Sequence, residues 1–552
     1  MRTEAGRSGV ERWSAVACTV LVAVFLLGPY VCRVDLFNND VAHHVFWLYG
    51  YADPQLFPND IAVDYFRTSA MWGYRAMYSA VAAEFDVLLA AEWLSVLLLV
   101  WCAVLAWKLG VAAEGSDSEM HGLLAVTAMC LLLQWSQAQD LLPPVAIQRT
   151  FALPMVLLTL WALVSERFVW VGVSWIAAAL VYPVVLPVQG LTAAVVFGRQ
   201  ILVKRRLPRH WAINLVAGAV AVSIAAVGVP IPAQIGPPLT YEQAMQLPEF
   251  GLQGRLGMYG EGWRGYWLRD QRTGLGWSAK VLALIALSVA VAWLGRASRR
   301  IPLAAWVMVL VGVGIWAAMR LFPEQLMFGL YLPNRHARWA IGAFGLLAMA
   351  AGASAAIDYF GRRFATSVGK ARRLRTLVAI LAPAAVAVAT VPSGIAAWRQ
   401  PVDRDLENTY GFIASLPKDT LVAAHPDLAD FVPVRTRRSV VTSTEISMAW
   451  MEGYYEVMKP RVEASLRAAY ATRIEDVDAQ LEPLGVDVML TGPAVWAKSG
   501  YFAPFDGLVH DLRERGRRDG FVLQHPPVDR ILFRSGDYYV IRVGNCPTGG
   551  CT

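Results

Sequence analysis

The feature that most constrains this chain is a series of long apolar runs that recur from Ser14 to Pro392 and then stop. These runs lack Lys, Arg, Asp and Glu, and many approach the roughly 20 apolar residues that an α-helix needs to cross a bilayer core. Only 16% of the residues are charged, whereas soluble domains carry about 25%. The sequence therefore predicts a polytopic α-helical membrane protein.

About eleven transmembrane spans can be placed on these runs. The first run follows several arginines, as in a signal peptide, but it lacks a small-x-small cleavage site and further spans follow. We therefore interpret it as a retained helix. The fifth and sixth spans share one apolar stretch that only Tyr182, Pro183 and Pro187 divide. The predicted spans are 14–32, 87–108, 122–136, 150–165, 168–184, 186–203, 211–229, 279–295, 303–320, 339–357 and 376–392.

The distribution of basic residues predicts the orientation in the membrane. Loops 199–210 and 296–300 carry arginines or lysines without an acid, and 358–375 adds only Asp358 to its basic residues. By the positive-inside rule, these loops and the N-terminus are cytoplasmic, in a multi-pass protein of the cytoplasmic (inner) membrane. The formal charge of +7 comes from such loops, which argues against nucleic acid as a partner. The predicted exoplasmic segments are 33–86, 137–149, 230–278, 321–338 and everything after about 393.

After Pro401 the pattern changes to that of a soluble α/β domain. A helix is expected at Leu406–Leu416, strands at Thr420–Ala424 and 485–490, a charged helical stretch at 456–480, and a closing hairpin around 530–543. The chain is thus divided into a transmembrane domain, 1–398, and an extracytoplasmic domain, 399–552. Near its end, Cys546 and Cys551 could close a small disulfide loop if they lie outside the cytoplasm.

The first exoplasmic loop, 33–86, is rich in acids and aromatic residues. We expect it to form short helices along the membrane interface, with aromatic rings at headgroup level. It contains Asp40, His43 and His44, which fall on one face of a short helix by their spacing. A carboxylate beside imidazoles can act as a general base or hold a divalent metal such as Mg²⁺ or Mn²⁺. The alternative is a capped interfacial helix whose histidines merely contact the interface.

Two further carboxylates of this loop are candidates for the same pocket. Asp60 and Asp64 follow a turn stiffened by Pro54 and Pro58. Asp60 could act with Asp40 as a second catalytic acid or base, or it could simply be a helix N-cap. For Asp64 the structural role is the better interpretation.

Arginines at two other exoplasmic helix ends suit an anionic headgroup or phosphate. Arg335 and Arg338 lie three residues apart at the mouth of a late span, and Arg149 lies at the end of another. Interfacial snorkelling would explain these arginines without a ligand. The loop 261–267 could be a mobile lid, a sugar-stacking surface or a simple interfacial loop. A structural role is expected for His425, Asp427, the run 435–438 and Glu445.

Taken together, this layout resembles the GT-C class of membrane glycosyltransferases. The matching segments are Asn39-Asp40 with His43-His44, the stretch 53–60, and Leu332-Pro333-Asn334-Arg335. They are similar to a bacterial branch of GT-C-like proteins. The adjacent Asp-Glu pair of the mannosyltransferases is absent, as is the Trp-Trp-Asp motif of oligosaccharyltransferases, so the acceptor stays open.

The resemblance implies a polyprenyl-phosphate-linked sugar donor whose lipid lies among the membrane lipids and helices. Asp40 would deprotonate an acceptor hydroxyl or bind a metal, and Arg335 would hold the leaving lipid phosphate. Displacement at C1 would invert the anomeric centre. The acceptor would be a glycan, a lipid or a protein.

Two other classes of function remain open from the sequence. A lipid or sugar transporter usually places ionisable residues near the membrane midplane, whereas the acids here cluster in a surface loop. A non-catalytic assembly or sensing protein would use the C-terminal domain to bind a partner and would tolerate loss of Asp40.

Overall fold

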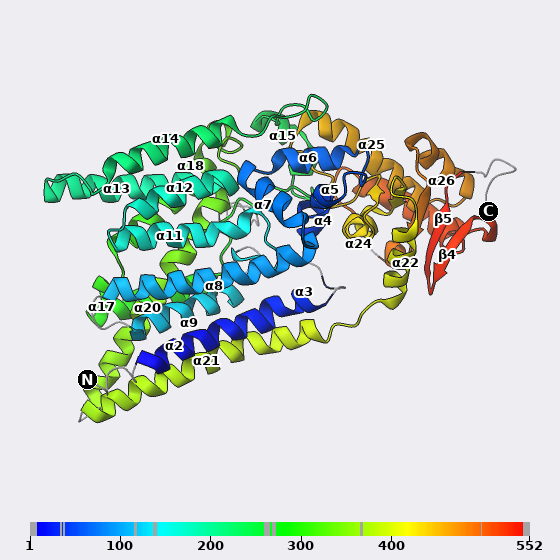
Figure 1. Cartoon of the computed structure of the whole chain (residues 1–552). Coiled ribbons are helices and arrows are strands. Elements are labelled where there is room, and N and C mark those ends of the chain that lie inside the picture. The colour runs from blue at the N-terminus through cyan, green and yellow to red at the C-terminus, as the bar shows by residue number, and fades with distance from the viewer. Residues whose placement is uncertain are drawn as a thin grey trace.

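The computed structural model describes residues 8–33, 36, 39–114, 119–135, 141–258, 265, 267, 272–364, 368–497 and 500–544. Cys546 and Cys551 lie outside these residues, and so does most of the candidate lid at 261–267. The described chain forms an elongated helical bundle with a smaller α/β unit at one end (Figure 1).

Every predicted span coincides with an apolar helix, although six of these helices are long and apolar enough to cross a membrane and the rest are shorter. The polytopic helical membrane fold is thereby confirmed. The helices are α2–α3 (Ser8–Val22, Gly28–Cys32, joined by the π-turn Ala23–Leu27), α8 (Val87–Glu114), α9 (Glu119–Trp135), α11 (Ala152–Val164), α12 (Val169–Val181), α13 (Leu186–Lys204), α14 (Trp211–Val227), α17 (Ala279–Leu294), α18 (Leu303–Leu321), α20 (Pro333–Phe364) and α21 (Val368–Trp398).

Helix α20 is the most buried of the long apolar helices and packs against α18, α17 and α9. Small residues allow these close approaches. A Cβ on Gly312 would lie 2.6 Å from the Cβ of Ala340, and one on Gly352 would lie 2.7 Å from the carbonyl oxygen of Ser288. Glycine and alanine at such contacts let helix backbones approach closely, which is how helices associate in a bilayer. The N-terminus of α20 is therefore held firmly in place.

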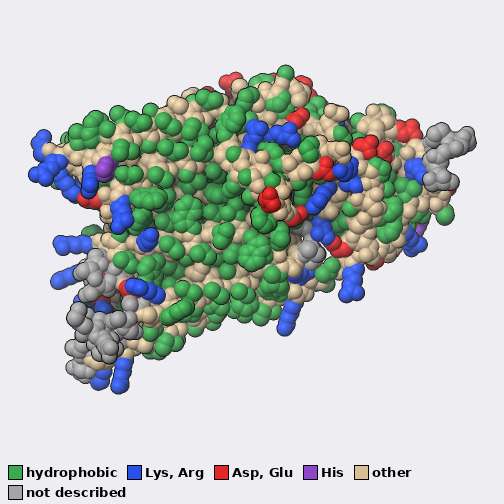
Figure 2. Space-filling model, in the orientation of Figure 1, with side chains coloured by type: hydrophobic (Ala, Val, Ile, Leu, Met, Phe, Trp, Pro, Cys, Tyr) green, Lys and Arg blue, Asp and Glu red, His purple; other side chains and the backbone are tan. Residues whose placement is uncertain are grey.

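The two ends of the bundle differ in charge. Lys and Arg side chains gather at the end far from the α/β unit, where the N-terminus and the α13–α14 connection lie (Figures 1 and 2). The first-loop helices and the α/β unit lie at the other end. This arrangement matches the separation of loops that the positive-inside rule predicted.

The C-terminal part forms a five-stranded mixed sheet in the order β2-β1-β3-β5-β4. Strands β2 (Ser439–Val440), β1 (Leu421–Ala424) and β3 (Val488–Thr491) are parallel, and the hairpin β4 (Ile531–Ser535) and β5 (Tyr538–Arg542) is antiparallel. The predicted α/β elements are confirmed. The main helices of this part are α22 (Arg404–Ser415), α25 (Glu452–Ala469), α26 (Ile474–Leu481) and α28 (Asp506–Asp519).

The first loop forms the expected short helices, but its aromatic rings lie elsewhere than predicted. Helices α4 (Val41–His44), α5 (Tyr49–Ala52), α6 (Ile61–Ser69) and α7 (Trp72–Ala82) pack between the bundle and the C-terminal domain. Trp47 and Phe46 are buried in the protein core, and Tyr65 stacks on Tyr454 with ring centroids 4.1 Å apart. The expectation of rings at headgroup level is wrong for these residues, because Phe46 and Trp47 pack against other rings of the first loop and Tyr65 packs against the C-terminal domain.

Ion pairs and a cation–π contact hold this docking in place. Lys418 Nζ donates to Asp53 Oδ2 over 2.6 Å, and Arg437 pairs with Asp86 at 3.0 Å while lying 4.6 Å from the ring centre of Tyr49. Contacts of this kind at the rim of an interface fix orientation more than they add stability. These contacts thus define the orientation of the C-terminal domain relative to the first loop.

Candidate functional site

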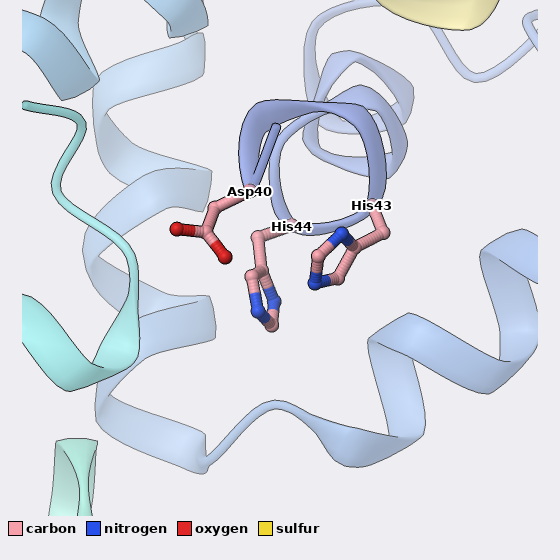
Figure 3. A group of neighbouring side chains, drawn as sticks. All are labelled: Asp40, His43 and His44. Carbon is pink, nitrogen blue, oxygen red and sulfur yellow. The ribbon is translucent and has the colours of Figure 1, made fainter. Parts of the chain in front are cut away.

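Asp40, His43 and His44 project from one side of α4, as their spacing predicted (Figure 3). One potential ligand atom of each lies within 4.8 Å of the others. Asp40 occupies the N-cap position, yet its side chain makes no capping hydrogen bond. His43 is only 7% exposed. The burial of His43 and the uncapped carboxylate of Asp40 favour the functional interpretation of this face over a capped helix with interfacial histidines.

Arg149 contacts the same carboxylate from another part of the chain. Its Nη2 donates a short hydrogen bond to Asp40 Oδ2, and both side chains are mostly buried. The 3₁₀ turn Gln148–Phe151 that carries Arg149 is held against α7, because Gln148 accepts from the backbone N–H of Met71 and Tyr78 donates to the carbonyl of Ala146 over 2.7 Å. These two hydrogen bonds fix the turn that holds the Arg149 side chain next to Asp40.

The arginines at the N-terminus of α20 join this group. Burial lowers the pKa of His44 well below its usual value, and the charges of His43, Arg149 and Arg335 lower it further. His44 is therefore a neutral imidazole at neutral pH. The charge of Arg335 thus acts on the imidazole next to Asp40, and the binding of one ligand by Asp40 and Arg335 stays a prediction.

Arg338 lies deeper in the same region, with 2% exposure. Gly276, at φ +72°, makes room for it, because a Cβ there would lie 2.6 Å from Arg338 Nη2. The charges of Arg335, Arg149 and Arg338 all act on Tyr182, which packs edge-on against Trp339 with ring centroids 5.6 Å apart. Snorkelling does not account for Arg338, since its guanidinium is enclosed by protein.

Glu445 enters the site from the C-terminal domain, where the sequence suggested only a structural role. Its Oε2 lies 3.2 Å from His43 Nδ1 and 2.8 Å from Arg255 Nη2. Burial alone would raise the pKa of Glu445, but the hydrogen bond with His43 and the charges of Arg255 and Arg272 lower it to about 2. Glu445 lies five residues after β2, at the carboxyl edge of the parallel strands, and β2 was not predicted as a strand from the sequence.

Asp430 supports Glu445. The backbone N–H of Glu445 donates to Asp430 Oδ1 over 2.7 Å. Burial, followed by the nearby Glu445 carboxylate, raises the pKa of Asp430 to about 7. Two carboxyl groups of opposite pKa shift thus lie side by side, a pattern common at functional sites.

Asp60 and Asp64 have other contacts. Asp60 is the N-cap of α6 and accepts from the backbone N–H of Ala62 over 2.9 Å. Burial raises the pKa of Asp60, while a hydrogen bond with Ser439 of β2 opposes that shift. Asp64 accepts from Gln234 over 3.5 Å. The N-cap alternative describes the local geometry of Asp60, and a catalytic role for it stays a prediction.

The donor set of Asp40, His43 and His44 fits a divalent transition metal. One carboxylate and two imidazoles suit Zn²⁺ or Mn²⁺, whereas Mg²⁺ prefers oxygen ligands and water. His44 is neutral and can coordinate, and Glu445 beside His43 Nδ1 gives the carboxylate–histidine contact that orients many ligating imidazoles. Arg149 engages one oxygen of Asp40. Of the metals expected from sequence, Mn²⁺ fits this set and Mg²⁺ fits it poorly.

The chain is similar in structure to solved proteins, but its sequence matches no known family. No family model and no curated protein matches the chain. The Archaeoglobus fulgidus oligosaccharyltransferase tethered with an acceptor peptide containing the NVT sequon matches over 92% of this chain and 71% of that chain, at 10% identity and a TM-score of 0.49. Its complex with Zn and sulfate matches over 92% and 70%, at 12% identity and a TM-score of 0.46.

A third structure is the oligosaccharyltransferase AglB from Archaeoglobus fulgidus in complex with an inhibitory peptide and a dolichol-phosphate. It matches over 87% of this chain and 69% of that chain, at 10% identity and a TM-score of 0.41. These TM-scores lie below 0.5, and membership of the bacterial branch of the GT-C class stays a prediction.

Proposed function

We propose that this protein is a membrane glycosyltransferase of the GT-C type, which transfers a sugar from a polyprenyl-phosphate donor to an acceptor hydroxyl at the extracytoplasmic face. The observation that carries the proposal is the contact of Asp40 from the first loop with Arg149, beside His44, on which the charges of Arg149 and Arg335 both act. Glycosyl transfer from a lipid phosphate requires these two kinds of group on one side of a membrane.

The reaction balances as a single displacement. The acceptor oxygen forms a bond to C1 of the sugar as the bond between C1 and the phosphate oxygen breaks. The hydroxyl proton passes to the Asp40 carboxylate, and polyprenyl phosphate leaves with the electron pair. Attack opposite the leaving group inverts the configuration at C1.

Arg335 and Arg338 would stabilise the leaving phosphate. Arg335 lies in the first turn of α20 and Arg338 in the next turn, close to the helix end whose dipole favours an anion. A phosphate would therefore bind favourably at this end of the helix. Charge stabilisation of this kind is often the largest catalytic contribution.

If Asp40 instead acts as a metal ligand, a divalent metal would be held by Asp40, His43 and His44. When bound, it would supply Lewis-acid stabilisation of negative charge on the phosphate or the acceptor oxygen. Glu445 would keep the His43 ring in its ligating orientation, and burial would keep His44 in its neutral form.

The proposal includes the membrane arrangement. The chain would lie in the cytoplasmic membrane with its N-terminus inside, and residues 399–552 would form an extracytoplasmic domain on the transmembrane domain 1–398. The gathering of basic side chains at the end opposite the site supports this orientation (Figure 2).

The deciding experiment supplies purified Asp40→Asn protein with radiolabelled polyprenyl-phosphate sugars. We expect transfer to fall at least about 100-fold, since general base catalysis contributes that much. Asp64→Asn, a neighbouring first-loop acid outside the cluster, is the matched control and should retain activity. Retained transfer in Asp40→Asn would show that another group is the base. Substrate flux in proteoliposomes without transfer would instead indicate a transporter.

A further inference from the structure

A second site lies at the carboxyl edge of the parallel strands. The chain passes from β1 to β2 on one side and then to β3 on the other, so the sheet order β2-β1-β3 reverses direction at β1. In open α/β sheets, ligands bind outside the carboxyl ends of the strands at such a switch point. The loops that leave β2 and β3 here line a cleft.

The cleft has about 30 Å³ of space for water-sized groups and is otherwise open to solvent, so a larger ligand would place one group inside the cleft and lie at its mouth. One wall comes from the segment 248–258 of the transmembrane part, and the other walls come from α25 and the loops after β2 and β3. Residues on its surface include Glu249, Arg255, Thr444, Tyr455, Tyr501 and Phe502.

Direct contacts hold these walls in place. The backbone N–H of Ala503 donates to the carbonyl of Gln253 over 3.1 Å, next to a β-bridge between Gly254 and Ala503. Thr444 Oγ1 lies 2.6 Å from Asp427 Oδ1 and 2.9 Å from the hydroxyl of Tyr501. Hydrogen bonds within and between the two parts of the chain therefore fix the walls of the cleft.

Two features of the lining indicate a sugar. Glu249 is 7% exposed, and its Oε2 has no hydrogen-bond partner among the described residues, while Oε1 accepts from the hydroxyl of Tyr455. Phe502 is 36% exposed, and of the described residues after Trp398 it is the only exposed aromatic side chain. A pyranose ring has hydroxyl groups at its edge and C–H groups on its faces. A hydroxyl could donate a hydrogen bond to the buried carboxylate oxygen of Glu249, and the C–H groups could contact the exposed ring of Phe502.

The cleft adjoins the candidate catalytic site. Arg255 lines the cleft and also lies 2.8 Å from Glu445, whose carboxylate lies 3.2 Å from His43. A molecule in the cleft is thus two side chains away from the Asp40 cluster. This separation suits a sugar next to the one that receives the transferred residue.

We propose that this cleft binds a sugar residue of a glycan acceptor, with Glu249 accepting a hydrogen bond from a ring hydroxyl and Phe502 contacting the ring face. The inference rests on the proposed function, and it narrows the acceptor from glycan, lipid or protein to a glycan.

The test uses the full-length protein in detergent and saturation-transfer NMR. The probes are glucose, mannose, galactose, arabinose and N-acetylglucosamine trisaccharides, together with an unstructured peptide of ten residues. We expect at least one trisaccharide to bind. Phe502→Ala should weaken that binding about fivefold or more, because loss of an aromatic contact is worth that much, and Glu249→Gln should also weaken it.

Two control variants separate this inference from the proposed function. Phe85→Ala removes a more exposed aromatic ring outside the cleft, 69% exposed against 36% for Phe502, and should bind the trisaccharide normally. Asp40→Asn should also bind it normally while losing transfer. Trisaccharide binding that Phe502→Ala and Glu249→Gln leave unchanged overturns the cleft assignment, even if transfer is observed. So does binding of the peptide alone. Trisaccharide binding without any transfer by the unaltered protein leaves the cleft standing and removes the proposed function.

Discussion

The two ends of the helical bundle each contain buried charges, and the difference between them distinguishes a structural network from a ligand site. At the end away from the C-terminal domain, Arg300 lies 2.7 Å from Glu114 and 2.8 Å from Asp358, and its Nη1 donates to Ser354 over 2.8 Å. Here one guanidinium is surrounded by acids and a hydroxyl from α8 and α20. This network is complete without a ligand and holds those helices together.

At the other end, guanidinium groups predominate. The charges of Arg149, Arg335 and Arg338 all act on Tyr182, and those of Arg149 and Arg335 also act on His44 of α4. Asp40 and Glu445 approach this group from the first loop and from the C-terminal domain. We infer that the end where guanidinium groups from several parts of the chain come together binds an anionic substrate, and that the Arg300 network at the opposite end stabilises the fold.

Replacing an arginine by methionine at each end of the bundle, at Arg338 or at Arg300, should give the largest contrast between loss of activity and loss of stability. Arg338→Met should lower kcat/KM for sugar transfer at least about 100-fold, since it removes charge stabilisation of the phosphate. Radiolabelled transfer assays at several donor concentrations measure the effect. Arg338→Lys, which keeps the charge but not the planar fork, should recover part of the activity. An Arg338→Met protein with full activity would contradict the assignment of the phosphate site.

Arg300→Met should instead reduce stability. Removing Arg300 leaves Glu114 and Asp358 without their shared cation, and breaking a buried pair costs about 3 kcal/mol, less here because the side chain keeps some exposure. Thermal unfolding in detergent should show a lower Tm, while the transfer activity of the folded fraction stays near that of the unaltered protein. A stable variant that loses activity would place substrate at this end as well.

Asp430 makes stability at the substrate end depend on pH. Its pKa is raised from 3.8 to about 7 in the folded protein, so the folded state retains a proton that the unfolded state has released. Stability should therefore fall as pH rises from about 4 to 7, by about 1.4 kcal/mol per pH unit in the middle of that window. Asp430→Asn should remove this contribution from unfolding curves measured between pH 5 and pH 7. If the free energy of unfolding of Asp430→Asn changes with pH as steeply as that of the unaltered protein, the raised pKa of Asp430 is contradicted.

The smallest effect is expected at Asp60. If Asp60 only caps α6, Asp60→Asn keeps a capping oxygen and should change stability by less than about 1 kcal/mol, with transfer activity retained. A loss of transfer comparable to that of Asp40→Asn would restore Asp60 to the catalytic group.

The local features of the site followed from sequence because they depend on short-range spacing. Asp40, His43 and His44 share a face because they lie three and four residues apart on one helical turn. The spans, and the strands of the C-terminal domain other than β2, followed from apolar length and alternation. In contrast, the role of Glu445 could not be predicted, since nothing near it in the chain indicates that strand β2 ends beside α4.

The sequence by itself determined the number of apolar helices, their uneven charge and the acid–imidazole face of the first loop, because bilayer thickness and helical periodicity act within one segment. Only the tertiary structure decided which arginines meet that face, that the first-loop aromatic rings are covered, and that Glu445 and Arg255 join the two parts of the chain. These contacts connect residues hundreds of positions apart, and they arise when packed surfaces dock, a process that no local pattern records.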